Sequence, residues 1–219
     1  MSIRKISFAP NEFYHIYNRG NSKQIIFHDK YDYDRFIKLL FISNGQENFK
    51  IQFIRKNNIY DTQRGKLLVG IGTYCLMPNH FHILLTQTEN GSISKFMQKL
   101  STAYSMYYNQ KYKRTGSLFE GKFKSEYVGK DRYLKYLFSY IHLNPVKLID
   151  SGWKEGGIKN KQETLYYLRN YKYSSYQDYL GIDREEKLIL NREMFPNYFP
   201  EKEPFEKEIF EWLTYRQDL

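Results

Sequence analysis

Two histidines separated by one residue, His80 and His82, are the first feature of the sequence that could carry chemistry. In a β-strand, residues i and i+2 point to the same face, so the two imidazoles would converge on one point. Neutral imidazole binds Zn, Mn, Fe and Ni, and two such ligands need a third oxygen or nitrogen donor to complete a site. Because short motifs also arise by chance, the pair could equally be two surface histidines on a half-exposed strand.

A second group of polar residues lies in the segment 140–147. Tyr140 and Asn144 are four residues apart and would be neighbours on one helix face. Asn144 could instead be a simple helix cap before Pro145. Tyr140 could be a packing residue, since the chain has 22 tyrosines and most tyrosines pack. The pattern alone does not separate Tyr140 from four other tyrosines, which are Tyr107, Tyr108, Tyr133 and Tyr136.

The third feature is a basic segment, residues 95–124, which contains seven Lys or Arg residues and one acidic residue. A run of charge is often only a solvated face. Here it is interleaved with Tyr and Phe, which favours a groove for single-stranded nucleic acid, because bases stack on aromatic rings while lysines follow the phosphates. The predicted DNA contacts are Lys95, Lys99, Arg114, Lys122 and Lys124, with Arg19 in a glycine-containing turn as a further one.

Hydrophobic periodicity indicates the elements that must position these groups. We expect strands at residues 12–18, 51–54, 67–76, 80–86 and 122–128 and helices at 31–41, 92–107 and 131–144. Ser92 is the expected N-cap of the second helix, and Pro145 should end the third. The order of elements predicts an α+β protein, a ferredoxin-like βαββαβ sandwich with an appended helix.

The chain changes character near residue 150. We expect a core domain at residues 1–150 and a mostly helical C-terminal extension at 151–219 that is acidic at its end. Residues 197–219 carry −3, so the formal net charge of +10 leaves +13 on residues 1–196. The last helix should be amphipathic and pack on the domain or on a partner. Its apolar face comprises Phe205, Ile209, Trp212 and Leu213.

Composition excludes several classes of protein. The single cysteine, Cys75, excludes a disulfide framework and a Cys-based zinc finger, and it fits a cytoplasmic protein. The first residues lack the apolar run of a signal peptide. Residues 67–88 carry no Asp, Glu, Lys or Arg, but Pro78 and the two histidines in their middle favour two buried strands over a membrane span.

Four ordered motifs together resemble the single-tyrosine HUH transposases, most closely the REP-associated tyrosine transposase-like branch. They are residues 13–20 (FYHIYNRG), 77–85 (MPNHFHILL), 114–124 (RTGSLFEGKFK) and 140–146 (YIHLNPV). The resemblance spans roughly residues 8–150, and ordered motifs are far more specific than a single H-x-H pair. Beyond it, only residues 173–176 (YSSY) resemble a motif that follows the core.

This resemblance implies a DNA transposase that cuts single-stranded hairpin DNA and forms a 5′-phosphotyrosine intermediate. By this resemblance, Tyr140 matches the nucleophile. His80, His82 and Asn144 match the ligands of a divalent metal, Mg or Mn. Members of the wider family act as homodimers or monomers, so the resemblance leaves the oligomeric state open.

Two other functions stay open at this stage. A replication initiator or relaxase-like nicking enzyme uses the same chemistry, although the short chain and single candidate tyrosine weigh against it. A non-catalytic nucleic-acid-binding protein with a vestigial site is the other, and the intact set of site residues argues against it. Of the remaining histidines, His142 should be structural because it lies nearly opposite Tyr140 on the helix. His15 could either approach the site or pack, and His28 should lie on the surface.

Overall fold

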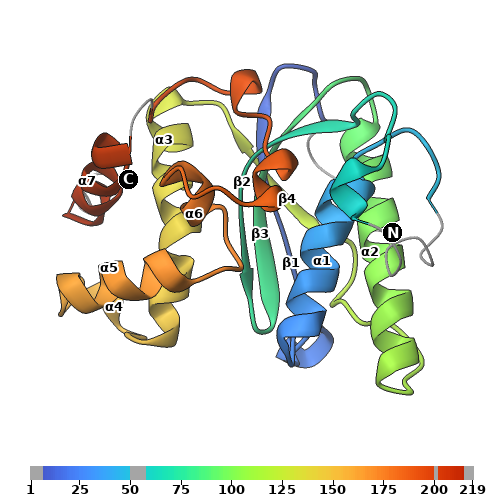
Figure 1. Cartoon of the computed structure of the whole chain (residues 1–219), viewed down its shortest axis with the longest axis horizontal. Helices are drawn as coiled ribbons and strands as arrows, with labels where there is room; N and C mark the ends of the chain where they lie inside the picture. Colours follow the sequence, from blue (N-terminus) through green and yellow to red (C-terminus); the bar gives the residue numbers. More distant parts are fainter. Residues whose placement is uncertain (1–6, 50–57, 200–201, 215–219) are drawn as a thin grey trace.

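The computed structural model describes residues 7–49, 58–199 and 202–214 of the chain (Figure 1). Its first part comprises β1 (Phe13–Arg19), α1 (Lys30–Ile42), β2 (Val69–Met77), β3 (His80–Gln87), α2 (Ser92–Lys111), β4 (Lys124–Val128) and α3 (Asp131–Leu143). The extension adds α4 (Trp153–Gly156), α5 (Lys161–Asn170), α6 (Tyr176–Tyr179) and α7 (Lys202–Thr214). Short 3₁₀ turns lie at Asn21–Lys23, Ile59–Asp61, Asn144–Leu148, Glu185–Ile189 and Arg192–Met194.

The four strands form one antiparallel sheet in the order β2-β3-β1-β4. With the connections β1–α1–β2 and β3–α2–β4, this is the ferredoxin-like βαββαβ arrangement. The predicted fold class is therefore confirmed, with α3 as the appended helix and further helices in the extension. The strand expected at residues 51–54 lies outside the described residues.

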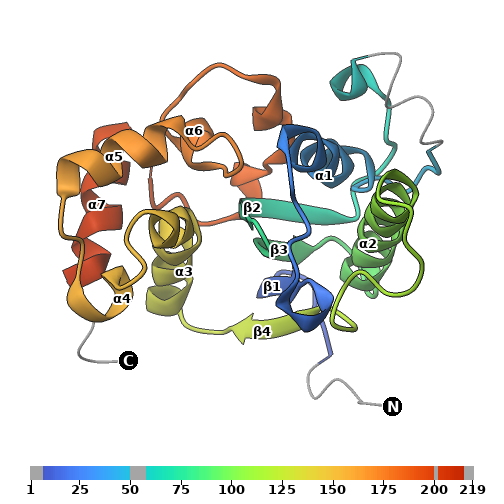
Figure 2. The ribbon, with the colours of Figure 1, turned by 90° about the horizontal axis from the view of Figure 1, so that it is seen from below.

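Alternation along the strands assigns their side chains to two faces. On β3, Phe81 and Ile83 are fully buried in the cluster formed with α1 and α2. Leu84 packs in the cluster on the opposite side, with α3 and the extension. Because side chains alternate with a period of two, His80 and His82 share the face of Leu84. Figure 2 shows the sheet between α1 and α2 on one side and α3, α5 and α7 on the other.

The helix α3 lies across the second face and holds the extension in place. Phe138 and Ile141 of α3 are buried in the same cluster as Phe205 and Ile209 of α7. The last helix therefore packs on the domain, one of the two outcomes expected for it. The side chains of Trp212 and Leu213 lie outside the described part of the chain.

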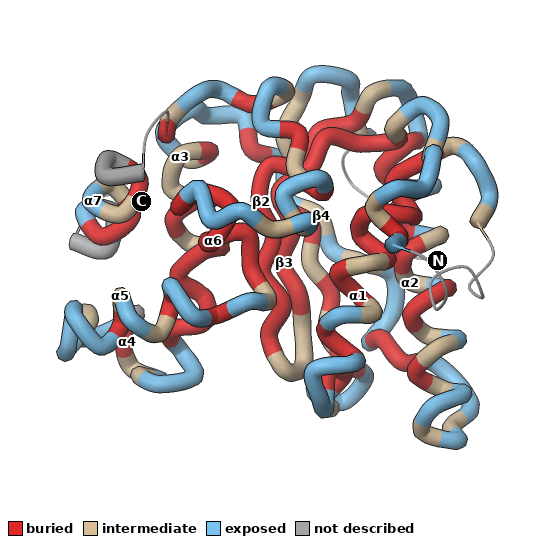
Figure 3. Tube along the Cα trace, viewed as in Figure 1, coloured by how far each residue is buried: buried red, intermediate tan, exposed pale blue. Residues whose placement is uncertain are grey.

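Segments of the extension run beside β2 and bond to its backbone. Leu76 N–H donates to the carbonyl of Tyr173 at 2.9 Å, and Ser175 N–H donates to the carbonyl of Tyr74 at 3.0 Å. Asn191 N–H donates to the carbonyl of Ile71 at 2.9 Å. Every residue of β2 is buried as a result, as the red strand in Figure 3 shows.

The N-cap predicted for α2 was wrong by one residue. Gly91 is the N-cap, with φ of +80°, and Ser92 is the first helical residue. Glycine takes this left-handed conformation without a steric cost, which explains why the chain turns there. The buried Ser92 hydroxyl makes no hydrogen bond.

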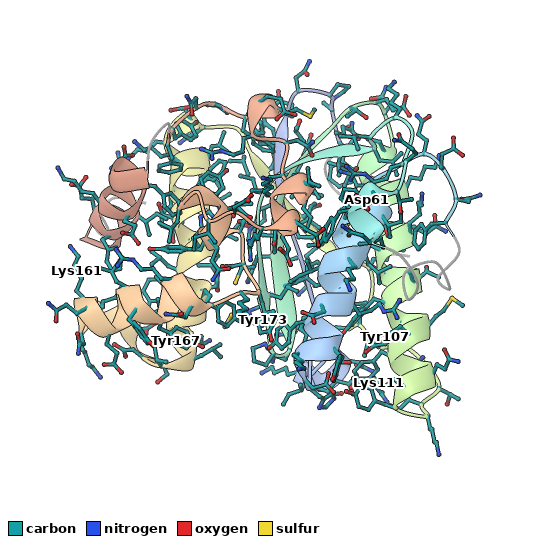
Figure 4. All side chains as sticks on the ribbon, in the orientation of Figure 1. Asp61, Tyr107, Lys111, Lys161, Tyr167 and Tyr173 are labelled. Carbon is teal, nitrogen blue, oxygen red and sulfur yellow. The ribbon has the colours of Figure 1, made fainter. Side chains whose placement is uncertain are left out.

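A buried carboxylate ties α1 to α2. Asp32 is fully buried and accepts hydrogen bonds from Lys111 Nζ at 2.6 Å and from the hydroxyls of Tyr107 at 2.9 Å and Tyr112 at 2.7 Å. Figure 4 labels Tyr107 and Lys111, which lie on α2 beside α1. Burial alone would raise the pKa of Asp32, but these partners and the His28 N–H outweigh it and the pKa is lowered.

Candidate active site

The two histidines of the H-x-H pair converge at the start of β3. Their ring centroids lie 5.0 Å apart and the ring planes are perpendicular. His82 is buried and His80 is half-buried, while Phe81 between them is fully buried on the opposite face. The strand alternation that the sequence predicted therefore brings both imidazoles to one place.

The C-terminal end of α3 places Tyr140 and Asn144 over these histidines. The Tyr140 ring lies 5.7 Å from the His82 ring, centroid to centroid, and nearly perpendicular to it. Asn144 is buried at the end of the helix, where its Nδ2 donates to the carbonyl of Tyr140 at 2.9 Å. Asn144 thus has the capping position that proline-terminated helices favour, and its side chain still borders the site.

These four side chains open on one cleft of about 410 Å³. The other lining residues are Tyr17, Asn18, Arg19, Lys23, Asn79, Lys124 and Lys147. The cleft lies between the end of β1, the starts of β3 and β4, and the end of α3. Its lining includes four basic residues and no acidic one among the described residues, a composition that suits an anionic ligand.

Burial raises the pKa of the Tyr140 hydroxyl above its usual value of 10.0. The Asn144 amide acts in the opposite direction, and the charge of Glu126 adds to the increase. Tyr140 is therefore a neutral phenol near pH 7, and it must lose its proton in any reaction in which it attacks.

The contacts of His80 with Asn79 and of His82 with His15 use the same ring nitrogen. His80 Nδ1 lies 2.6 Å from Asn79 Oδ1, and His82 Nδ1 lies 2.8 Å from His15 Nε2. His15, for which the sequence left two roles open, is buried on β1 and contacts the site through His82. In each candidate ligand the remaining nitrogen is Nε2.

Only two of the six predicted DNA contacts, Arg19 and Lys124, line the cleft. Arg19 forms a bidentate ion pair with Glu120, with Nε–Oε2 of 2.5 Å and Nη2–Oε1 of 2.7 Å. Lys99 donates to the carbonyls of Gly45 at 2.5 Å and of Glu47 at 2.7 Å. The other three residues, Lys95, Arg114 and Lys122, lie on α2 or between α2 and β4.

The sequence motifs did not single out Lys23 and Lys147, which also line the cleft. Lys23 follows β1 in a turn where Ser22 and Lys23 both have left-handed φ, 53° and 59°. Lys147 lies in the 3₁₀ turn that follows α3. The one available signal was that Lys147 comes three residues after Asn144, directly after the final motif.

His142 and Cys75 are buried and do not line the cleft, which agrees with the structural role expected for His142. His142 Nε2 lies 2.9 Å from Thr73 Oγ1 and 2.8 Å from Ser175 Oγ. Burial lowers the pKa of His142 to about 3, so this histidine is neutral at any pH near 7. His28 is exposed and pairs with the Tyr108 hydroxyl at 2.7 Å.

Comparison with known families decides the wider classification. The family model described as "Transposase IS200 like" matches residues 12–144, which is more than half of the chain and contains every residue that lines the cleft except Lys147. The chain belongs to the IS200-like transposase family. Its ferredoxin-like core and the α3 helix are thus the parts shared with that family.

Solved structures with this fold include a REP-associated tyrosine transposase bound to a REP hairpin. The match covers 85% of the IS200-like chain and 90% of the other protein, with 12% identity and a TM-score of 0.53. It extends beyond the family match and shows a shared fold. A second match is a bacterial tRNA(His) guanylyltransferase-like protein in complex with ATP, which covers 80% of the IS200-like chain and 74% of the other protein, with 12% identity. Its TM-score of 0.38 is too low to support a conclusion. No curated protein matches the sequence.

Among the described residues, no helix of this IS200-like protein is long and apolar enough to cross a membrane. The uncharged segment 67–88 forms β2, a two-residue turn and β3. It therefore forms two buried strands, as the proline and histidines in its middle indicated, but β2 is an edge strand of the sheet and only β3 lies inside it.

Proposed function

We propose that this chain acts in transposition by cutting and rejoining single-stranded DNA, with Tyr140 as nucleophile and His80, His82 and Asn144 as ligands of Mg or Mn. The observation that carries the proposal is the convergence of these four side chains, from β3 and α3, on one basic cleft. Family membership supports the transposase activity.

The donor set suits a divalent ion. The described residues contain no cluster of three or more His, Cys, Asp or Glu side chains placed to hold a metal. The proposed set instead combines two imidazoles with an amide oxygen, and phosphate oxygens of the DNA would add to these donors. A bound Mg or Mn would polarise a non-bridging phosphate oxygen and so stabilise the charge that develops at phosphorus.

Tyr140 performs the covalent step of the proposed reaction. The bond from its Oη to the scissile phosphorus forms while the bond from phosphorus to the 3′ oxygen breaks. The phenol loses its proton and the departing 3′ oxygen gains one, which leaves a 5′-phosphotyrosine and a 3′-hydroxyl. The phosphotyrosine conserves the energy of the phosphodiester, so the reverse attack by a 3′-hydroxyl can join strands without another energy source.

The basic lining indicates the path of the DNA. Lys23, Lys124 and Lys147 come from three different elements around Tyr140 and would contact phosphates on either side of the scissile bond. The structurally similar REP-associated transposase is bound to a hairpin, so we propose a single strand next to a hairpin as the substrate.

A covalent-adduct assay tests the proposal. The protein is incubated with labelled hairpin-flanked single strands and Mn²⁺, denatured in detergent and separated by electrophoresis. Wild type should form a labelled adduct and Tyr140→Phe should form none. Tyr136→Phe is the matched control, because Tyr136 lies one turn earlier on α3 with its ring 5.9 Å from that of Tyr140.

Two outcomes would overturn the assignment. Adducts that persist in Tyr140→Phe but disappear in Tyr17→Phe would make Tyr17, which also lines the cleft, the nucleophile. No adduct from wild type over a broad library of hairpins, with binding to the same DNA retained, would favour the non-catalytic binding protein.

A further inference from the structure

A buried contact between two histidines connects the proposed metal site to β4. His15 and His82 are only 4% and 7% exposed, and His15 Nε2 lies 2.8 Å from His82 Nδ1. The two rings are nearly parallel, with their centroids 5.0 Å apart. A contact this short between two ring nitrogens requires one of them to carry a hydrogen and the other to accept it.

The negative charge of Glu126 on β4 favours one direction of that hydrogen bond. Its Oε2 lies 3.7 Å from His15 Nδ1, on the side of the ring away from His82, which is close enough for electrostatic attraction but longer than a hydrogen bond, and the buried Nδ1 has no other hydrogen-bond partner among the described residues. A carboxylate can only accept, so the arrangement favours a hydrogen on His15 Nδ1. His15 Nε2 then accepts from His82 Nδ1, and the lone pair of His82 lies on Nε2.

Glu126 is itself held by two tyrosines from different elements. Tyr17 on β1 donates its hydroxyl to Oε1 at 2.9 Å, and Tyr133 on α3 donates to Oε2 at 3.4 Å. The carboxylate is about half exposed, yet its position is fixed from both sides. It therefore provides a defined acceptor next to His15 and not a mobile surface charge.

We propose that His15 and Glu126 are positioning residues, which hold His82 in the tautomer and orientation that present Nε2 to the divalent ion. This inference rests on the metal site of the proposed function. Hydrogen bonds of this kind, from the second nitrogen of a metal-binding histidine to a fixed acceptor, set both ring orientation and ligand strength.

The other candidate ligand has a comparable support. Asn79 Nδ2 donates to the carbonyl of Lys23 at 3.2 Å, which turns Oδ1 of the same amide toward His80 Nδ1. His80 must therefore carry its hydrogen on Nδ1 and its lone pair on Nε2. Both imidazoles thus reach the same protonation pattern through different neighbours.

Mn²⁺ affinity, measured by the electron paramagnetic resonance signal of the unbound ion, tests the inference without DNA. His15→Leu and Glu126→Leu should each weaken binding by about 10–100-fold. His15→Gln should restore most of the affinity, because its terminal amide reaches as far as Nε2 and can accept from His82. Glu126→Gln should likewise bind more tightly than Glu126→Leu, since it keeps an acceptor oxygen.

Nitrogen-15 NMR of the metal-free protein gives an independent readout. Long-range proton–nitrogen correlations at about pH 8 distinguish the Nδ1–H from the Nε2–H tautomer of each imidazole. Wild type should show His82 as Nδ1–H, and His15→Leu should shift it toward Nε2–H, while the His80 signals stay unchanged. A purely structural role for His15 would not move the His82 tautomer.

The two readouts separate failure of this inference from failure of the proposed function. Wild type that binds no Mn²⁺ would refute the metal site, whereas normal Mn²⁺ affinity in folded His15→Leu would refute only the positioning role. His82 found as Nε2–H in wild type would also refute it. If His15→Leu does not fold, the comparison of Glu126→Leu with Glu126→Gln decides, because the half-exposed Glu126 tolerates substitution more readily.

Discussion

Asn144 is hydrogen-bonded to the residue that carries the proposed nucleophile. Its side-chain Nδ2 donates to the backbone carbonyl of Tyr140, one helical turn earlier, at 2.9 Å. This bond satisfies a carbonyl at the end of α3 and fixes which end of the amide is the nitrogen. The oxygen Oδ1 is consequently the end that can serve as a ligand, and it moves with the same helical turn as Tyr140.

Asn144→Ala should weaken Mn²⁺ binding about tenfold or more, while Asn144→Asp should bind at least as tightly as wild type, because hard cations prefer carboxylate oxygens. Asn170→Ala is the matched control. Asn170 makes the same bond from Nδ2 to the carbonyl four residues earlier, Tyr166, at 2.7 Å, but on α5. Equal loss in both alanine variants would show that the effect comes from helix capping and not from ligation.

Glu120→Gln should strengthen binding of single-stranded DNA, because it releases Arg19 from its bidentate ion pair. The plot of log affinity against log salt should become steeper by about 0.7, which corresponds to one more phosphate contact. Asp183→Asn, which breaks the exposed ion pair with Lys187, removes the same charge elsewhere. An identical change in Asp183→Asn would show that the effect comes from net charge alone and not from the release of Arg19.

Lys23→Ala and Lys147→Ala should each lower the salt slope by about 0.7, since each removes one cation from the lining of the cleft. Lys95→Ala, on α2, makes the same change outside the lining. Fluorescence anisotropy with a labelled single strand at several salt concentrations measures both the affinity for DNA and its salt slope. A larger loss in Lys95→Ala would place the DNA along α2, the path that the basic segment 95–124 predicted.

Asp32→Asn should lower the free energy of unfolding at pH 7 by about 2–4 kcal/mol, since it removes a buried charge that holds Lys111 and two tyrosines. The folded-state pKa of Asp32 lies below its unfolded value, so its stabilisation is complete above about pH 4 and is lost as the pH falls through the folded value. Urea unfolding from acid to neutral pH should therefore show the two proteins converging at low pH. Exposed Asp61→Asn serves as control, and a constant difference between wild type and Asp32→Asn would contradict the explanation.

Ser175→Ala should cost about 1–3 kcal/mol in unfolding free energy, because the Ser175 hydroxyl bonds to His142 and Thr73 in a fully buried site. The exposed Ser151→Ala should cost little. Mn²⁺ affinity of folded Ser175→Ala should match that of wild type. A loss of affinity would give His142 a part in the site and not only in the core.

The sequence could predict what depends on local periodicity. Alternation placed His80 and His82 on one face of a strand, and Pro145 placed Asn144 at the end of a helix. These two local rules account for most of the proposed site, because the ferredoxin-like order of elements then brings β3 and α3 together. The sequence motifs were needed to choose Tyr140 among the tyrosines and to assign His80, His82 and Asn144 as metal ligands instead of surface and capping residues.

The parts that escaped prediction depend on contacts between distant segments. Arg19 looked like a phosphate contact, but Glu120, 101 residues later, pairs with it. Lys23 reaches the cleft through left-handed backbone at Ser22 and Lys23, and although Gly20 marks a turn nearby, neither left-handed position is a glycine. From its pattern alone, His15 could either pack or approach the site. The pairing of β1 with β3, which sets Tyr17 opposite His82, decides between these two roles.

The backbone bonds between β2 and the extension bear on whether the edge of the sheet can pair with another chain. β2 is an outer strand of the sheet, nine residues long and largely apolar, and an uncovered strand of that kind is a template for aggregation. Residues 173–175 and Asn191 occupy backbone groups along it. Loss of the extension would thus expose an edge strand that can pair with other chains, so residues 173–175 and Asn191 should limit self-association regardless of any part they have in handling DNA.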